Sequence, residues 1–279
     1  MNLQSVSCCL PEYLSQLDPR PYGYARPVAT AGSVGIEFLK IAADQALEMA
    51  QCKAKDIDLI VSLSWSPDHM IDDPAIMGPR VGHPLQKLIG ATNAFVFDMM
   101  DASLAKTLHI INHFALMQSM RRVLVVRMDV GHGLSADETS GFRIPDGAFA
   151  LVLSPDQNAQ FHRQNISGDF QPLKVDLRSN ILSDKGIKAS FSFPYQESLC
   201  RSVEETYRYL SHFGGPTRRY LCERWFSDES HNKPCLGPFE LPFQLHHECT
   251  PSESYLVVSF DPFNLSVEAT TLSRKKALA

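Results

Sequence analysis

One candidate nucleophile, Ser103, lies in the segment FDMMDASLAKTLHIINHF (residues 97–114), where a short strand passes through an acidic turn into a helix. An α/β enzyme is expected to keep its nucleophile at such a turn. However, a serine hydroxyl attacks nothing until a correctly placed base takes its proton. Serine is also among the best residues for capping a helix, and Asp98 and Asp101 add negative charge at the positive end of the helix dipole. We therefore interpret Ser103 as a helix cap.

Two histidine pairs have spacings that could suggest metal binding. His109 and His113 are four residues apart, which places two imidazoles on one helix face, but the apolar residues around them indicate a helix packed in the core. His246 and His247 are adjacent in an expected helix and point in different directions, so they cannot easily chelate one ion. The Gly131-His132-Gly133 turn lacks both phosphate-loop patterns. We expect no metal and no cofactor.

The composition is that of a globular protein with no affinity for nucleic acid. The chain has 279 residues, 44% of them hydrophobic, and a formal net charge of -5, so it can bury a substantial core. The like-charged run at residues 274–276 is read as a solvated chain end. Nucleic acid is itself negatively charged, so we do not expect it to be a partner of this chain.

Cysteine use and hydropathy favour the cytoplasm. The seven cysteines show no CxxC spacing, and their odd number suits a reducing compartment. Cys8 and Cys9 are expected in a strand, without a reactive role. No stretch reaches the roughly 18 apolar residues of a membrane span, and the first residues lack the order of a signal peptide.

Strand and helix patterns alternate through the first half. Short apolar runs predict strands covered on both faces, and apolar residues at helical spacing predict the helices between them. Gly90 suits a helix end. Together they predict a mostly parallel sheet covered by helices. The expected strands are residues 58–63, 95–97, 123–126 and 148–153, and the expected helices are residues 37–51, the stretch ending at 85–89, and the helix after Ser103.

A repeated segment indicates a duplicated fold. Residues 256–261 (LVVSFD) have the character of residues 124–129 (LVVRMD) at an offset of 132. Each copy follows an apolar helix and precedes a second strand-like run, at residues 148–153 and 265–271. Matched neighbours on both sides favour a duplicated α/β unit. Residues 157–200, rich in glycine, proline and polar residues, are expected as loops or an abbreviated cap.

Several consecutive segments resemble a known family. Residues 56–61, 66–68, 85–91, 94–98 and 146–148 look like successive landmarks of 3-oxoacyl-[acyl carrier protein] synthase III. The segments SLSWSPDHMIDDPAIMGPRVGHPLQKLIGA, VFDMMDASLAK, VLVVRMDVGHGLSADETSGF and CLGPFELPFQL…VSFDPF more closely resemble the B subunits of two-subunit 2-alkyl-4-quinolone synthases. The resemblance implies a thiolase-like α/β fold of five layers, α-β-α-β-α. Its duplicated halves would be residues 1–155 and 156–279, forming a single unit.

The resemblance also implies that three catalytic positions have changed. Ser103 falls where the family keeps a nucleophilic Cys, Glu223 or a neighbour falls where it keeps a His, and Pro238 falls where it keeps an Asn. A thiolate forms near neutral pH far more readily than an alkoxide. Three changes together favour a chain that is not catalytic by itself. Two alternatives stay open: a serine-dependent acyltransferase homodimer using Ser103 with Glu223, and a stand-alone acyl-thioester-binding module.

The expected partner is a catalytic synthase III-like subunit with a Cys-His site, in a heterodimer or a heterotetramer. The resemblance implies that the partner binds acyl-CoA and 2-aminobenzoylacetate and forms 2-alkyl-4-quinolones. It also places a loop of this chain, residues 69–73, against the partner's acyl pocket. Met70 and Ile71 would then line that pocket; packing within their own domain is the alternative.

Overall fold

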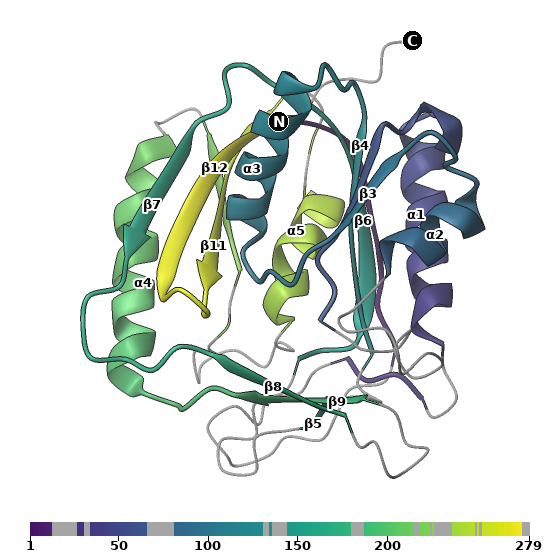
Figure 1. Cartoon of the computed structure of the whole chain (residues 1–279). Helices are drawn as coiled ribbons and strands as arrows, with labels where there is room; N and C mark the ends of the chain where they lie inside the picture. Colours follow the sequence, from purple (N-terminus) through teal and green to yellow (C-terminus); the bar gives the residue numbers. More distant parts are fainter. Residues whose placement is uncertain are drawn as a thin grey trace.

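The structure is a computed structural model, and it describes residues 1–12, 27–30, 34–65, 81–130, 134–135, 144–179, 187–214, 218–223, 225, 236–248, 250 and 253–274 (Figure 1). The first half contains β1 (Asn2–Cys9), α1 (Gly35–Met49), β2 (Leu59–Ser62), α2 (Gly82–Ile89), β3 (Phe95–Asp98), α3 (Leu104–Met117), β4 (Val123–Asp129), β5 (Leu134–Ser135) and β6 (Gly147–Ser154). The second half contains β7 (Phe161–Asn165), β8 (Lys174–Ser179), β9 (Ile187–Ser192), α4 (Glu197–Ser211), β10 (Arg219–Cys222), α5 (Glu240–Glu248), β11 (Ser254–Asp261) and β12 (Ser266–Arg274). Short 3-10 turns lie at Ala54–Asp56, His212–Gly214 and Gly237–Phe239.

The sheet topology repeats, which confirms the predicted duplication. In the first half β1 pairs antiparallel with β6, β6 antiparallel with β4, and β4 parallel with β2. In the second half β7, β12, β11 and β10 pair in the same sequence of orientations. The LVVRMD and LVVSFD segments lie in the equivalent strands β4 and β11. The halves join where β1 pairs with β12 at Asn2–Ser273 and Leu3–Arg274; their division at residue 155 stays a prediction.

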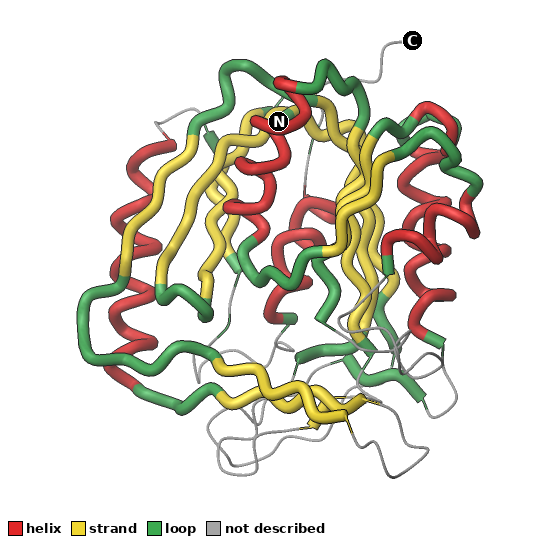
Figure 2. Tube along the Cα trace, in the orientation of Figure 1, coloured by secondary structure: helices red, strands yellow, loops and turns green. Residues whose placement is uncertain are grey.

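The elements stack in five layers, as predicted. Figure 1 shows α4 outside the second-half strands, α3 and α5 between the two sets of strands, and α1 with α2 outside the first-half strands. Contacts agree with this order, because α1 packs on β6 and β4, α3 on β11 and β12, and α4 on β11 and β12. The tube view in Figure 2 shows the small sheet of β5, β9 and β8 across one end of these layers. No described helix combines the length and apolar character needed to cross a bilayer.

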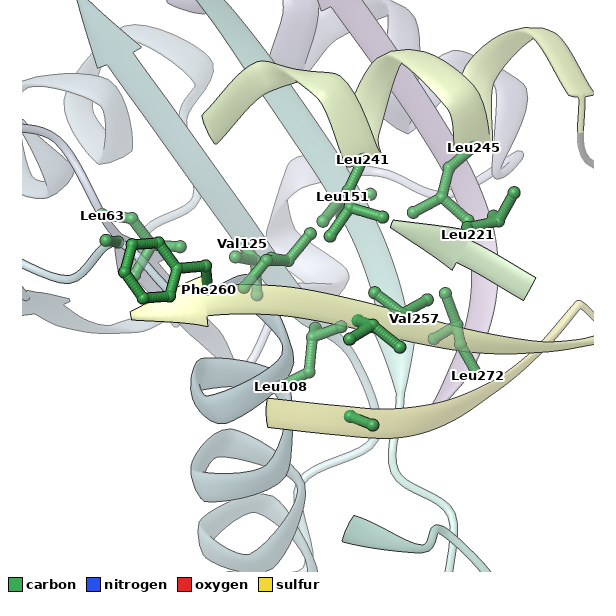
Figure 3. Close-up of a cluster of buried hydrophobic side chains, with 14 of the residues drawn as sticks. Leu63, Leu108, Val125, Leu151, Leu221, Leu241, Leu245, Val257, Phe260 and Leu272 are labelled. Atoms are coloured by element: carbon green, nitrogen blue, oxygen red, sulfur yellow. The ribbon is translucent and has the colours of Figure 1, made fainter. Parts of the chain in front are cut away.

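The central strands are buried on both faces because helices cover both. Along β4, Val123 and Val125 face the central helices, whereas Leu124 and Val126 pack in the separate cluster beneath α1. This two-residue alternation is the normal geometry of a strand. Figure 3 shows the central cluster, in which side chains of both halves meet: Leu63, Leu108, Val125, Leu151, Leu221, Leu241, Leu245, Val257, Phe260 and Leu272.

Most predicted elements are confirmed, but two expectations were wrong. The large sheet is mixed and not mostly parallel, because β1–β6, β4–β6, β11–β12 and β7–β12 pair antiparallel. The predicted helix at 37–51 is α1, and the predicted strands are β2, β3, β4, β6, β11 and β12. Gly90 ends α2 with a left-handed φ of 75°, as expected of a helix-terminal glycine. Of the two alternatives for residues 157–200, loops were wrong, because that segment contains β7, β8, β9 and the first turn of α4; an abbreviated cap stays a prediction. Strand β8 pairs with the next strand, β9, but β7 pairs with β12 and β9 also with β5, and local composition does not encode such long-range pairing.

Candidate functional site

The N-terminus of α3 lies in the central layer and is capped by Ser103, as predicted. Ser103 has an extended backbone, and its Oγ accepts a hydrogen bond of 3.2 Å from the Lys106 amide. Asp101 Oδ1 accepts one of 3.2 Å from the Ser103 amide. The expectation that Asp98 serves the same helix was wrong: its Oδ1 accepts from the amides of Val81 and Gly82, at the start of α2. Asp98 ends β3, so its side chain caps the helix beside that strand.

The Ser103 hydroxyl is fully buried and contacts a second serine. Its Oγ lies 2.7 Å from Ser259 Oγ on β11, and Ser259 Oγ accepts a hydrogen bond of 2.9 Å from the Ala105 amide. No imidazole hydrogen-bonds to Ser103 within the residues that the structure describes. Without a base, the hydroxyl keeps its proton and remains a weak nucleophile.

Glu268, which the sequence did not single out, lies beside this pair of serines. It is the partner of Ser259 in the β11–β12 register and is fully buried. Burial raises the pKa of Glu268, while the hydroxyls of Ser266 and Ser103 act in the opposite direction. The one available signal was a glutamate inside the otherwise uncharged run SVEATTL, which is unusual for a strand buried on both faces.

An ion triad joins α3 to the second half. Lys106 Nζ lies 3.0 Å from Asp101 Oδ1 and also contacts Asp261 Oδ2 on β11. Burial by itself lowers the pKa of Lys106, but the carboxylates of Asp101 and Asp261 have the larger combined effect and raise this pKa. The Lys106 ammonium is therefore held charged and cannot accept the Ser103 proton.

Glu223, at the position the resemblance assigns to a histidine, is fully buried just beyond β10. Its Oε1 accepts hydrogen bonds from Trp225 Nε1 (2.7 Å) and from the Phe260 amide (2.6 Å). Burial raises the pKa of Glu223 well above its usual 4.5, although these bonds and the Arg127 guanidinium lower it. Glu223 Oε1 is thus engaged by two donors other than the Ser103 hydroxyl, which does not position it as the base of that serine.

Arg127 is the largest polar side chain buried in this centre, and it was missed because the sequence showed it only as part of a repeated strand. It faces the central layer from β4 and is 1% exposed. Its Nε donates to Asp129 Oδ2 at 2.6 Å, and its Nη1 donates to the Asp101 carbonyl at 3.2 Å. The guanidinium also stacks 4.7 Å from the centre of the Trp65 ring. Its charge is thus neutralised inside the protein by Asp129.

The two tryptophans of the chain occupy equivalent places in the two halves. Trp65 lies three residues beyond the end of β2, and Trp225 lies three residues beyond the end of β10. Their ring centres are 6.2 Å apart, and both rings are almost completely buried. Phe263 packs edge-on against Trp65 at 5.0 Å. Large rings therefore fill the centre between the halves.

Pro238, at the third predicted position, begins the turn into α5. It is buried and follows Gly237, whose φ is +47°. Proline has no amide hydrogen, so it supplies neither the side-chain donor of an asparagine nor a backbone donor. Phe239 lies 5.8 Å from the Arg127 guanidinium. Arg127 thus links the surroundings of Ser103, Glu223 and Pro238.

The remaining candidates contribute no chemistry to this centre. Met70 and Ile71 lie outside the described residues. His109 stacks on Phe161 at 4.1 Å, and burial and then His113 lower its pKa. The expectation that both histidines lie in the core was wrong for His113, which is exposed because it lies on the outer side of α3. No metal-binding group of His, Cys, Asp or Glu occurs in the described part of the chain.

The other cysteine and histidine predictions can also be placed. Cys8 and Cys9 lie in β1, as predicted, and burial raises the pKa of both thiols. His246 Nδ1 lies 2.9 Å from the Val6 carbonyl, whereas His247 packs on Phe243. The adjacent histidines of α5 therefore have different neighbours, as expected. The Gly131–Gly133 turn lies outside the described residues.

A second candidate region, which we call the β3–α3 face, is exposed and apolar. It consists of Phe95 and Phe97 on β3 together with Ile110, Phe114 and Met117 on α3. Within the described part of the chain, β3 is an edge strand that pairs only with β2, and Phe97 packs edge-on against Phe114 at 5.4 Å. Phe95 is 65% exposed and Met117 is 68% exposed. Such a patch beside an unpaired strand edge is typical of a protein interface.

The fold is that of the ketosynthase III class. The chain superposes on the priming β-ketosynthase of the R1128 polyketide pathway with a TM-score of 0.72, at 16% identity, covering 99% of this chain and 97% of that one. It superposes on 3-oxoacyl-(acyl carrier protein) synthase III of Pseudomonas aeruginosa PAO1 with a TM-score of 0.71, at 15% identity, covering 100% and 99%. These similarities establish the fold. No protein-family model matches the chain.

Sequence similarity defines the family more narrowly. The chain is 38% identical over 277 residues to the 2-heptyl-4(1H)-quinolone synthase subunit PqsB of Pseudomonas aeruginosa, covering 98% of this chain and 97% of that protein. It is 27% identical over 196 residues to β-ketoacyl-[acyl-carrier-protein] synthase III of Xylella fastidiosa, covering 65% and 58%. The chain therefore belongs to the PqsB family of quinolone synthase subunits, as the sequence motifs indicated.

Proposed function

We propose that this chain is the non-catalytic subunit of a heteromeric, synthase III-like acyltransferase that makes 2-alkyl-4-quinolones. The observation that carries the proposal is the state of Ser103, a buried hydroxyl paired with Ser259. The carboxyl at the predicted histidine position, Glu223, accepts hydrogen bonds from Trp225 and from the Phe260 amide and not from Ser103. A serine hydroxyl that has neither the acidity of a thiol nor an imidazole beside it in the described part of the chain is poorly suited to acyl transfer.

The β3–α3 face supports a role in assembly. Pairing the free edge of β3 with a strand of another chain would satisfy its backbone groups and cover Phe95 and Phe97. The outward side of α3 would be covered at the same time, since Ile110 and Met117 lie on the same face of that helix. We propose that the catalytic subunit covers this face in a heterodimer.

The chemistry then belongs to the partner. The partner's Cys would attack the acyl-CoA thioester and release coenzyme A, so that the acyl group is held on the enzyme. Decarboxylation of 2-aminobenzoylacetate would supply the carbon nucleophile that takes this acyl group and frees the thiolate. Attack of the aromatic amine on the new ketone, with loss of water, would close the quinolone ring. We propose that this chain supplies the interface and shapes the acyl pocket, with Met70 and Ile71 among the lining residues, and that the complex is cytoplasmic.

The test is intact-mass measurement of the chain alone and of the co-purified complex after exposure to acyl-CoA. The expected result is an acyl adduct on the partner and none on this chain. A Met70→Asp variant should form the complex but acylate the partner more slowly, and Lys40→Asp, an exposed change on α1, serves as its control. An unchanged rate for Met70→Asp would count against the pocket role without affecting the assembly role.

A second function is favoured by one observation, the closeness of Ser103 to Glu268. A serine-dependent acyltransferase would use the Glu268 carboxylate as its base and would act without a partner. It predicts an acyl ester on Ser103 of the isolated chain that turns over. The same mass measurement distinguishes the two functions, because only the second gives an adduct on the lone chain.

A further inference from the structure

The outer side of α4 carries exposed aromatic side chains that the proposed function does not use. Tyr209 is 57% exposed and Phe213 is 40% exposed, and their rings meet edge-on at 5.3 Å. Phe213 also packs on His162 of β7 at 4.4 Å. Exposed aromatic side chains are enriched in protein interfaces. We call this region, with the charged residues beside it, the β7–α4 surface: His162, Glu204, Glu205, Arg208, Tyr209 and Phe213.

The aromatic side chains of this surface lie over an edge strand. Within the described part of the chain, β7 pairs only with β12. Phe161 stacks on His109 of α3, whereas His162 packs on Phe213, as expected for alternate residues of one strand. The end of α4 therefore covers the outer face of β7, and Figure 1 shows α4 as the outermost layer on this side. Exposed rings beside an edge strand favour contact with another chain.

The charged residues on the exposed side of α4 are ordered by sign. Near the start of the helix, Arg201 Nη2 lies 2.5 Å from Glu197 Oε1, so these two charges neutralise each other. Further along, Glu204 and Glu205 are followed by Arg208, and all three are exposed. Residues three or four apart share one side of a helix. An acidic stretch is therefore followed by a basic residue and then by the aromatic end of the surface.

This order of charges fits a second copy of the same chain. In a two-fold contact both copies use the same surface, and two α4 helices that meet across the axis can run antiparallel. Glu205 of each copy then lies opposite Arg208 of the other, with the axis between these two positions. Tyr209 is less than one turn from that axis, so each copy covers the ring of the other. A parallel arrangement would instead set like charges opposite each other.

We propose that the β7–α4 surface binds a second copy of this chain about a two-fold axis, with antiparallel α4 helices and ion pairs between Glu205 and Arg208. The β7–α4 surface shares no residue with the β3–α3 face, so one chain can use both surfaces at once. The self-association therefore does not depend on the proposed function. In a complex with the catalytic subunit, it would join two heterodimers into a heterotetramer.

Sedimentation equilibrium of the full chain tests the proposal. At about 50 μM, well above a micromolar dissociation constant, the expected mass is twice the 31.2 kDa of one chain. Tyr209→Asp places a carboxylate beside the axis in both copies and should raise the dissociation constant about 100-fold. Phe95→Asp is the matched control, because it makes the same kind of change on the β3–α3 face, and it should remain dimeric. Circular dichroism checks the fold of both variants.

Two results of this experiment would overturn the proposal. The first is an unmodified chain that stays monomeric at this concentration. The second is a dimer that is lost in Phe95→Asp and kept in Tyr209→Asp, which would assign the self-contact to the β3–α3 face. Binding of the catalytic subunit by Tyr209→Asp should be unchanged, so a failure of the self-association is distinguishable from a failure of the proposed function.

Charge reversal tests the antiparallel arrangement itself. Glu205→Arg alone and Arg208→Glu alone each set like charges opposite each other across the axis, and each should weaken the dimer about tenfold. The double variant Glu205→Arg/Arg208→Glu again sets opposite charges against each other and should recover the affinity of the unmodified chain. Lys87→Glu, an exposed change on α2, serves as the control and should leave the dimer intact. A double variant that binds no better than the single variants would overturn the proposed pairing.

Discussion

The two regions of helix α3 differ sharply. Its N-terminus contains the candidate catalytic residue, whereas its outer side belongs to the proposed assembly surface. At its start, Ser103 and Lys106 are enclosed by polar groups of both halves, with Ser259 and Asp261 on β11 as their direct partners. Along its outer side, Ile110 and Met117 are exposed beside the free edge of β3. The N-terminal end of α3, where the resemblance places an active site, is buried. The outer side of α3 is exposed to solvent and apolar.

The two regions also differ in whether their charged and apolar side chains have neighbours within the chain. In the buried centre, Arg127 is neutralised by Asp129 and Lys106 by two carboxylates, so its charges have partners within the chain. On the β3–α3 face, the apolar side chain of Phe95 is largely exposed to solvent. Burying large aromatic side chains stabilises a complex, whereas leaving them in water does not. This exposed apolar face favours a chain that functions in a complex with another subunit, which would cover the face.

The largest expected effect comes from breaking the closed centre at Arg127. Arg127→Met leaves the Asp129 carboxylate buried without its cation, which should lower the free energy of unfolding by about 3–5 kcal/mol. Urea unfolding of the chain measures this loss. Arg122→Met is the matched control, because Arg122 forms only a surface ion pair with Asp56 at 3.6 Å and should cost about 1 kcal/mol or less. Equal losses in the two variants would show that the centre is no more sensitive than the surface.

A charge on the β3–α3 face should break assembly while leaving the fold intact. Phe95→Asp places a carboxylate in the proposed interface and should weaken binding of the catalytic subunit about 100-fold. The affinity is measured by titration calorimetry with the purified partner, and circular dichroism checks the fold. Ile41→Asp, on the exposed side of α1, should bind normally. Undiminished affinity of Phe95→Asp would exclude this face as the interface.

The ionisation of Glu223 gives a pH-dependent comparison. Because burial raises the pKa of Glu223 above its usual 4.5, the folded chain binds this proton more tightly than the unfolded chain does. The resulting stability is fully present below pH 4.5 and decreases as the pH rises towards the folded pKa. Glu223→Gln has no proton to lose. From pH 5 to 8 the unmodified chain should therefore lose stability relative to Glu223→Gln, by at most about 1.4 kcal/mol per pH unit.

This difference is measured by urea unfolding of both proteins across that range. Other titrating groups are common to both proteins and cancel in the difference. A constant difference would mean that Glu223 keeps an ordinary pKa in the folded chain.

The smallest effect is expected at Ser103 itself. Ser103→Ala removes the α3 cap and should cost about 1 kcal/mol of stability, while product formation by the assembled complex should change less than about twofold. Quinolone formation by the complex and thermal unfolding of the chain give the two readouts. If the stable, assembled Ser103→Ala complex made no product, Ser103 would be part of the catalytic machinery.

The helices and strands of the first half could be predicted because they depend on local patterns. The short continuous apolar runs of β2 and β4, the apolar stripe of α1 and the glycine after α2 are all readable along the chain. The 132-residue repeat likewise required only sequence, and it identified β4 and β11 as equivalent strands. The segment containing β7, β8 and β9 was missed, because β7 and β9 pair with distant strands, β12 and β5, and such pairing leaves little local signal.

Only part of the candidate site could be predicted from the sequence. The resemblance assigns Ser103, Glu223 and Pro238 to catalytic positions of the family, which stays a prediction, whereas capping preference predicted the hydrogen bond between Ser103 and the first turn of α3. Arg127, Trp65 and Glu268 were not predicted. Their roles depend on contacts between residues of the two halves, such as the bond from Ser103 to Ser259 across 156 positions of the chain.

The sequence alone therefore determined the family and the duplicated α/β fold, since these follow from residue identity and spacing; the change of three catalytic residue types stays a prediction from the resemblance. Only the tertiary structure decided that the centre around Ser103 is filled by a neutralised arginine and two tryptophans, and that α3 exposes an apolar side next to the edge strand β3. Burial and pairing of charges depend on which distant residues meet, and the folded arrangement of both halves fixes that.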